Sequence, residues 1–331
     1  MTRSRLAPGT GIVTVPGGAP VLRTSGGEFL RIDTGGVTGE DLVRRLAGEG
    51  TPEEEEAPDE GAHTAELARL VEAFEAAGYA LSTPPRAPLA GRTVHVLGDP
   101  VLTAPVARCA GAEGAEVHRI TPDGVAELAR VAPDDGAEGR VAVVWCLDSP
   151  VPEGLWDTAD RLPGRRIAWL RCHREGAHSW IEPLAAAPGD VTSRHIRLRR
   201  LAATPAHREL AAYWAGHRTP DTGPHPTEAS AALIAALLTA DLIAWAEAEA
   251  EAEAEAEAEA EAEAEAEAGE VEGAGTGRAT VLPVRRRLRR IDLRDLTLTE
   301  HPVLPVPDVA PLPAPAAVRT RAAAGTAEAR P

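Results

Sequence analysis

The sequence of 331 residues contains no lysine, no asparagine and no glutamine. Without lysine, the chain has neither a phosphate-loop lysine nor a lysine that forms a Schiff base with a carbonyl substrate. Without the two amides, it lacks side chains that often read nucleobases or complete an oxyanion hole. The corresponding chemistries are excluded, and all 34 basic side chains are arginines.

Cysteine is scarce, and Cys109, Cys146 and Cys172 lie far apart in or beside apolar segments. This pattern predicts buried free thiols and gives no support to a disulfide framework. Histidines cluster in the middle third of the chain, but no Cys-x-x-Cys or His-x-x-x-His pair gathers zinc ligands. We therefore expect no metal site. The clustered histidines, which we expect at the surface or in loops, are His173, His178, His195, His207, His217 and His225.

No apolar run is long enough to span a membrane, and the first residues lack the apolar core of a signal peptide. We predict a soluble, cytoplasmic chain without a membrane partner. The net charge of −17 is dominated by the eleven alternating glutamates of residues 247–267. Without them, 40 acidic residues face 34 arginines, a net charge of −6, which gives no general attraction for nucleic acid.

Residues 92–120 predict a strand, a glycine turn, a helix and a second strand, the outline of a nucleotide-binding βαβ unit. The three glycine positions of the fingerprint G-x-G-x-x-G are occupied here by Gly98, Pro100 and Thr103. Pro100 has no N–H to donate to a phosphate, and no acidic residue follows the second strand to hold a ribose. We predict a Rossmann-like scaffold with a degenerate nucleotide site.

Residues 1–86 predict a separate module of winged-helix-like α+β type. Three β-prone runs joined by glycine turns predict an antiparallel meander at residues 12–15, 21–23 and 29–32. Two amphipathic helices, N-capped by Thr38 and Thr64, and a short closing strand at residues 79–81 complete the module.

A sheet edge beside an amphipathic helix is suited to bind a peptide as an added strand. The second helix, residues 64–77, carries Arg69 against three glutamates, which disfavours contact with DNA phosphates. A dimerisation or scaffolding role fits the same module.

Beyond a proline linker at residues 83–88, strands alternate with helices. The predicted strands lie at residues 141–147, 167–171 and 179–184, and the predicted helices at residues 124–131, 153–162, 209–214 and 226–245. This order predicts the α/β class, with a mainly parallel sheet, helices on both faces and an antiparallel addition at one edge. Asp148 ends the first of these strands, where α/β proteins gather ligands, and with Gly98 it is the candidate for cofactor binding.

Residues 246–268 alternate strictly between alanine and glutamate, and we expect them to extend the preceding helix as a solvated, fraying end. Residues 280–282 and 290–298 predict returning strands. The five arginines between Arg285 and Arg290 suggest nucleic acid, but a basic sheet edge or a neighbour for the glutamates is favoured.

Three stretches carry a resemblance to a known family: residues 94–120; residues 180–201 with Thr204 and Pro205; and residues 291–308, IDLRDLTLTEHPVLPVPD. The last is the most specific, because its ending H-P-x-x-P-x-P-D is characteristic. Across most of residues 12–311, the chain resembles ThiF-like (ubiquitin-activating-enzyme-like) leader-peptide-binding proteins. These proteins partner YcaO cyclodehydratases in making thiazole/oxazole-modified peptides such as bacteriocins and thiopeptides.

The resemblance implies a non-catalytic member without a cofactor. Family members commonly carry two cysteine pairs for a structural zinc. Here the first pair's positions are Thr192 and His195, and no cysteine follows Asp308, so the resemblance implies that the zinc is lost. Pro100 and Thr103 depart from the glycine loop of an adenylating member.

The resemblance also implies a division of labour. It predicts a leader-binding module at 1–86, a degenerate ThiF-like domain at 87–245, a Glu-Ala insertion at 246–277, a β segment completing that domain at 278–311 and a disordered tail at 312–331. The predicted peptide-binding residues are Phe29, Leu30, Arg31, Ile32, Glu66, Arg69 and Ala73. The predicted partners are the leader of a precursor peptide and a YcaO-type cyclodehydratase, with a homodimer left open.

Two alternatives stay open at the level of the sequence. One is a degenerate adenylating enzyme that uses ATP through Asp148. The other is a winged-helix DNA-binding regulator with a Rossmann-like sensor domain.

Overall fold

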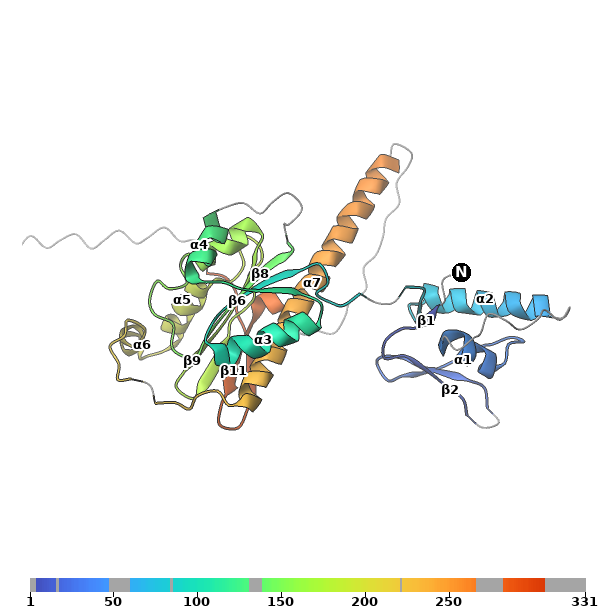
Figure 1. Ribbon diagram of the computed structural model, residues 1–331, viewed down its shortest axis with the longest axis horizontal. Helices are drawn as coiled ribbons and strands as arrows, with labels where there is room; N and C mark the ends of the chain where they lie inside the picture. Colours follow the sequence, from blue (N-terminus) through green and yellow to red (C-terminus); the bar gives the residue numbers. More distant parts are fainter. Residues whose placement is uncertain are drawn as a thin grey trace, which may run out of the picture. The chain divides into compact units, whose positions relative to one another are not determined.

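A computed structural model describes residues 4–15, 18–47, 60–83, 86–130, 139–220, 222–265 and 282–306, apart from the side chains of residues 60–63 and 257–265. The chain divides into two compact units, Met1–Ala87 and Pro88–Pro331 (Figure 1). Each unit has its own hydrophobic core. The predicted tail at 312–331, and most of the predicted strand at 280–282, lie outside the described residues.

Unit 1 contains a three-stranded antiparallel sheet of order β2-β3-β4, two helices and a small two-stranded sheet. Its elements are β1 (Arg5–Leu6), β2 (Gly11–Val13), β3 (Val21–Arg23), β4 (Phe29–Arg31), α1 (Gly39–Ala47), α2 (Glu60–Ala76) and β5 (Ala80–Leu81), with β5 pairing with β1. The predicted meander is confirmed. The winged-helix comparison stays a prediction.

The two helices of unit 1 bury one apolar face against the sheet, with Leu22, Leu42 and Phe74 in the core. Thr38 caps α1 as predicted, because its Oγ1 accepts the N–H of Asp41 at 3.2 Å. The predicted cap at Thr64 is wrong, since α2 begins four residues earlier, at Glu60.

Unit 2 is built on a seven-stranded mixed sheet of order β12-β11-β10-β9-β8-β6-β7. Its strands are β6 (Thr93–Gly98), β7 (Glu116–Arg119), β8 (Val141–Leu147), β9 (Ala168–Glu175), β10 (His178–Ile181), β11 (Arg287–Asp292) and β12 (Leu298–Pro302). Strands β7, β6, β8 and β9 are parallel to one another. Strands β10, β11 and β12 each pair with the preceding strand in the antiparallel sense. The α/β class and the antiparallel addition at one edge are therefore confirmed. The comparison with a Rossmann fold stays a prediction.

Helical segments cover both faces of this sheet. They are α3 (Pro100–Ala112), α4 (Pro122–Arg130), the 3₁₀ turns η1 (Ala159–Arg165) and η3 (Val284–Arg286), α5 (Ser193–Ala203), α6 (His207–Trp214) and α7 (Glu228–Glu265). Helices α3 and α7 bury one face of the central strands, and α4 and η1 bury the other. The alternation along β8 explains this, because Val144 points to one core and Val143 to the other.

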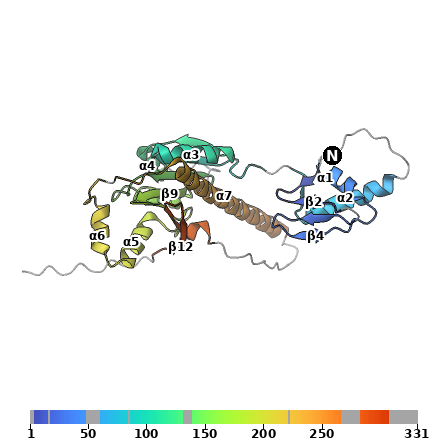
Figure 2. The ribbon, with the colours of Figure 1, turned by 90° about the horizontal axis from the view of Figure 1, so that it is seen from below.

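Helix α7 continues from its apolar half into the Ala-Glu run and extends beyond the sheet (Figures 1 and 2). Of the helices in the described part of the chain, residues 228–256 alone are long and apolar enough to cross a membrane. In the structure, 56% of the apolar window is buried, and Leu238 and Leu242 are fully buried against the sheet. The apolar half of α7 is thus a core helix of unit 2.

Two predicted elements of unit 2 need correction, and one helix was missed. Residues 153–158 form turns, and a 3₁₀ turn replaces the predicted helix, because Gly154 has a φ of 78° and Pro163 cannot donate a backbone hydrogen bond. The predicted strand at 290–298 is two strands with a turn between them. Helix α5 was not predicted, since its sequence SRHIRLRRLAA buries only Ser193 and Ile196 and shows little apolar periodicity.

Candidate functional site

Strand β4 lies at an edge of the unit 1 sheet. Its ladder with β3 includes a hydrogen bond from the N–H of Ile32 to the carbonyl of Pro20 at 3.3 Å. In an antiparallel pair, alternate residues face the partner strand, so the backbone of Leu30 faces β3 and the backbones of Phe29 and Arg31 face the outer edge. Within the described ranges, no strand pairs with β4 on that outer edge.

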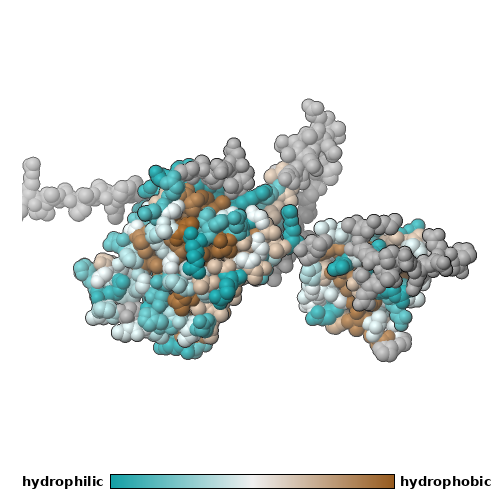
Figure 3. Space-filling view, in the orientation of Figure 1, coloured by the Kyte–Doolittle hydropathy of each residue, from teal (hydrophilic) through white to brown (hydrophobic). Residues whose placement is uncertain are grey.

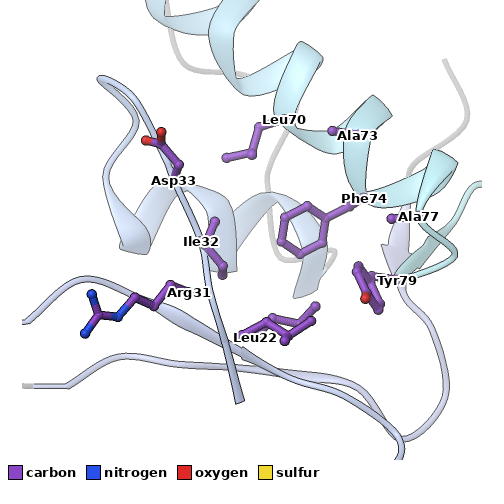
Figure 4. A pocket seen from close by; sticks show the side chains of 10 residues that line it. Leu22, Arg31, Ile32, Asp33, Leu70, Ala73, Phe74, Ala77 and Tyr79 are labelled. Carbon is purple, nitrogen blue, oxygen red and sulfur yellow. The ribbon is translucent and has the colours of Figure 1, made fainter. Parts of the chain in front are cut away.

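A groove of about 230 Å³ runs between this edge and α2. Its lining residues come from β3, from β4 and the two residues after it, from one face of α2 and from the turn that follows α2: Leu22, Leu30, Arg31, Ile32, Asp33, Leu70, Ala73, Phe74, Ala77 and Tyr79 (Figure 4). The ring of Phe74 reaches from α2 toward the strand, and the guanidinium of Arg31 points away from this ring (Figure 4). The lining is mostly apolar, so an extended peptide beside β4 would bury alternate apolar side chains here.

Four of the predicted peptide-binding residues border this groove: Leu30, Arg31, Ile32 and Ala73. Phe29 lies at the same edge, with 63% of its surface exposed. Arg69 is exposed one helical turn before Ala73. Glu66 has a different position, because its Oε1 accepts the N–H of Gly36 at 3.1 Å and so holds the loop that follows β4.

Sequence reasoning missed several residues of the groove wall, chiefly Leu70, Phe74 and Ala77. Together with Ala73, they lie at spacings of three and four residues along α2. The same spacing marks an amphipathic face, so the signal was present in the sequence.

The other face of the unit 1 sheet is exposed and partly apolar. Cross-strand pairing aligns Val13, Val21 and Arg31 in one row and Gly11, Arg23 and Phe29 in the next. Val13 and Phe29 are exposed, as is Val15 just beyond β2. Figure 3 shows apolar surface on unit 1 in the region of its strands.

In unit 2, the degenerate nucleotide region is tightly closed around Gly98. This glycine ends β6 with a φ of 111°, and an added Cβ would lie 1.8 Å from the carbonyl oxygen of Cys146. The same carbonyl accepts the N–H of Asp99 at 2.9 Å. The need for glycine at position 98 therefore has a backbone explanation that requires no ligand.

Asp148 follows β8 and is paired within the protein. Its carboxylate forms an ion pair with Arg174, whose side chain is only 1% exposed, and its Oδ2 lies 2.6 Å from Nδ1 of His225. Its backbone N–H donates to Oδ2 of Asp99 at 2.7 Å. These contacts occupy both carboxylate oxygens of Asp148, which the sequence predicted to bind a cofactor.

A group of charged side chains lies along β9 and just beyond the end of β10. Arg171 donates to Glu182 at 2.6 Å, and both groups are buried. Glu175 accepts hydrogen bonds from Arg200 at 2.5 Å and from Trp214 at 2.7 Å, and Nε2 of His173 lies 3.4 Å from it. Burial alone would raise the pKa of Glu175, but the interactions with His173 and Arg200 outweigh burial and hold this pKa well below its usual range.

The positions at which the resemblance implies a lost cysteine pair have another role here. The N–H of Thr192 donates to Nδ1 of His195 at 3.2 Å, at the start of α5. Beside them, Asp160 accepts hydrogen bonds from the N–H and hydroxyl of Ser193. Within the ranges that the structure describes, no group of three metal-binding side chains converges.

All three cysteines are free, and Cys146 and Cys172 are buried, as the sequence predicts, while Cys109 is partly buried. Burial raises the pKa of Cys146 to about 12 and that of Cys172 well above its ordinary value. Neither thiol has the low pKa of a nucleophile.

The arginines before β12 contact acidic residues of α7. Arg285 donates to Glu249 at 2.7 Å, at the start of the Ala-Glu run. Arg287 and Arg289 both pair with Asp241, at 2.7 and 2.5 Å. The expectation that these arginines neighbour the glutamate run is confirmed for Arg285.

The fold is shared with solved structures of heterocyclases. A heterocyclase in complex with substrate and cofactor matches with a TM-score of 0.58 at 11% identity, over 91% of this chain and 38% of that chain. The heterocyclase TruD matches with a TM-score of 0.59 at 15% identity, over 92% of this chain and 42% of that chain. This chain has a heterocyclase-like fold. It spans about two fifths of the length of those two heterocyclase chains.

A chain of the E. coli microcin synthetase McbBCD complex with pro-MccB17 bound matches with a TM-score of 0.43 at 12% identity, over 92% of this chain and 97% of that chain. The sequence matches no protein-family model and no curated protein. The heterocyclase-like fold therefore rests on the likeness of structure.

Proposed function

We propose that this chain binds the leader of a ribosomal precursor peptide and delivers the peptide to a YcaO-type cyclodehydratase in modified-peptide biosynthesis. The observation that carries the proposal is the open edge of β4 beside the apolar groove against α2. Backbone hydrogen bonds along Phe29 and Arg31 supply affinity, and the groove selects side chains. The heterocyclase-like fold supports the same biosynthetic setting.

In this proposal, unit 1 is the winged-helix-like peptide-binding module, and unit 2 is a degenerate ThiF-like, Rossmann-like scaffold. Joining leader recognition to a docking scaffold raises the effective concentration of the core peptide at the partner enzyme. The leader's affinity for unit 1 then sets how much peptide reaches the partner.

The chain acts as a non-catalytic partner, and the cyclodehydratase consumes the ATP. Pro100 at the start of α3 has no N–H to donate to a phosphate. Asp148 already forms an ion pair with Arg174 and contacts His225. We expect no ATP–pyrophosphate exchange by the purified chain with leader peptide. If the wild type catalysed ATP–pyrophosphate exchange and Asp148→Asn lost it, the adenylating alternative would be favoured.

Fluorescence polarisation of the full chain with labelled leader peptides from the same gene cluster tests the binding. Ala73→Glu places a charge in the apolar groove and should weaken binding by about tenfold or more. Ala68→Glu is the matched control, because Ala68 is exposed on α2 outside the groove, and it should bind like the wild type. The proposal fails if the wild type binds no leader, or if the two variants bind equally well.

A further inference from the structure

The outward face of the unit 1 sheet bears two arginines and no acidic residue among the described positions of β2, β3 and β4. Arg23 and Arg31 lie on this face, in neighbouring rows. Both are exposed, and neither forms an ion pair or a side-chain hydrogen bond with a described residue. Arg31 belongs to the edge strand, and Arg23 lies one strand further in.

A peptide added along β4 extends these rows by one position. Directly opposite residues in neighbouring strands place their Cβ atoms about 4.5–5.5 Å apart, close enough for side chains to contact. One outward side chain of the peptide therefore lies beside Arg31, and another, two residues away, lies beside Phe29. The side chain between them points to the other face, over the groove that Leu30 and Ala73 line.

We infer that the outer edge of β4 recognises two side chains of the leader that lie two residues apart. Arg31 binds an acidic side chain, and Phe29 contacts an apolar one. This inference rests on the proposed function and assigns a second recognition surface to the same site. Arg31 supplies an unopposed charge, and Phe29 supplies an exposed aromatic surface. The residue between the two is apolar because it enters the groove.

At the peptide position opposite Arg31, charge favours an acidic residue over a basic one. A basic side chain opposite Arg31 would face a like charge, with Arg23 one strand away and no carboxylate among the described positions of β2, β3 and β4 to compensate. Arg31 and Phe29 are thus specificity residues, and the groove is the apolar anchor.

Selection from a display library of short linear peptides with randomised positions tests the inference on the immobilised full chain. The wild type should enrich peptides in which an acidic and an apolar residue flank one apolar position. Arg31→Glu should enrich a basic residue in place of the acidic one and leave the apolar positions unchanged. The wild type should bind individual acidic peptides about 3- to 10-fold more tightly than their basic counterparts, and Arg31→Glu should reverse this preference.

Arg23→Glu is the matched control, because it makes the same charge change on the same face one strand away from the edge. It should select the same peptides as the wild type. Equal shifts in Arg23→Glu and Arg31→Glu would mean general electrostatic attraction and overturn the inference. Identical selections by the wild type and Arg31→Glu would overturn it as well.

The outcomes also separate the inference from the proposed function. If Ala73→Glu abolishes the enrichment but Arg31→Glu leaves it unchanged, the inference is overturned and the proposed function stands. Absence of enrichment on the wild type overturns both. Thermal unfolding of each variant checks folding, and Arg31→Glu should unfold like the wild type because Arg31 is exposed at the edge.

Discussion

Unit 1 leaves the outer edge of β4 and two arginines without described partners, whereas several buried charged groups of unit 2 pair with one another. In unit 1, the outer backbone groups of β4 and the side chain of Arg31 are available to a ligand. In unit 2, Asp148, Glu175 and Glu182 all accept hydrogen bonds or ion pairs from arginines. A group that is already paired gains little from a ligand, because binding would first break the existing contact. The difference supports the proposal that unit 1 recognises the peptide, and it indicates that these three paired carboxylates of unit 2 contribute to stability.

The largest effect is expected from Gly98→Ala in unit 2. The new Cβ would overlap the carbonyl oxygen of Cys146 in a left-handed backbone conformation, so unit 2 should lose at least about 4 kcal/mol of stability. All six tryptophans lie in unit 2, so the loss of stability is measured by urea unfolding followed by tryptophan fluorescence.

Gly91→Ala is the control for Gly98→Ala. Gly91 also has a positive φ, of 78°, but open space where a Cβ would be. Gly91→Ala should lower the stability of unit 2 by about 1 kcal/mol. If the two variants were equally stable, the close approach of β6 and β8 would not be what requires glycine at position 98.

An intermediate effect is expected from Glu175→Gln. The carboxylate accepts charged hydrogen bonds from a mostly buried position, so the variant should lose about 1.5–3 kcal/mol at neutral pH. The pKa of Glu175 is lowered in the folded state, so its stabilisation is present above the ordinary pKa of 4.5 and is lost as the pH falls toward the lowered value. The stability difference between wild type and variant should therefore shrink in acid.

Tryptophan fluorescence during urea unfolding at a series of pH values measures this difference. A gap that stays constant from neutral pH to well below 4.5 would contradict the assigned role of the Glu175 charge.

The smallest effect, and one on binding alone, is expected from Arg31→Pro. The N–H of Arg31 faces the outer edge, so Arg31→Pro removes a backbone donor for an added peptide together with the guanidinium, while the ladder with β3 stays complete. Leader affinity should fall by about tenfold, or about 1.4 kcal/mol, without unfolding of unit 1.

Leu30→Pro is the counterpart, since the backbone of Leu30 faces β3 and its proline variant should destabilise the sheet itself. Circular dichroism melting separates loss of structure from loss of binding. If Arg31→Pro melted like Leu30→Pro, the assigned direction of the β4 backbone would be wrong.

The elements of the fold that the sequence predicted best are those with strong local patterns. β8 is a continuous apolar run, and β3 lies between glycine turns, so both were predicted with the bounds that the structure shows. Helix α5 was missed because it buries few residues. A helix was predicted at 153–162 instead of the turn η1, where the positive φ of Gly154 before η1 and the Pro163 within it constrain the backbone.

The candidate groove was only partly predictable. Leu30, Ile32 and Ala73 follow from a strand and a helix that bury alternate and helically spaced residues. Glu66 was assigned to the peptide, but its contact with Gly36 joins residues 30 positions apart and has no local signal. The pairing of Asp148 with Arg174 and His225 likewise depends on strands and loops that meet only in the folded chain.

The sequence by itself determined most of the elements, the α/β class and the absence of lysine and amide chemistry, because these depend on composition and on periods of two or 3.6 residues. Tertiary structure alone decided which polar groups remain available. Arg31 and Arg174 are the same residue type, but one lies at an exposed sheet edge and the other is buried against a carboxylate. That distinction arises from contacts between residues far apart in the chain, and desolvation and pairing then determine what each charge can do.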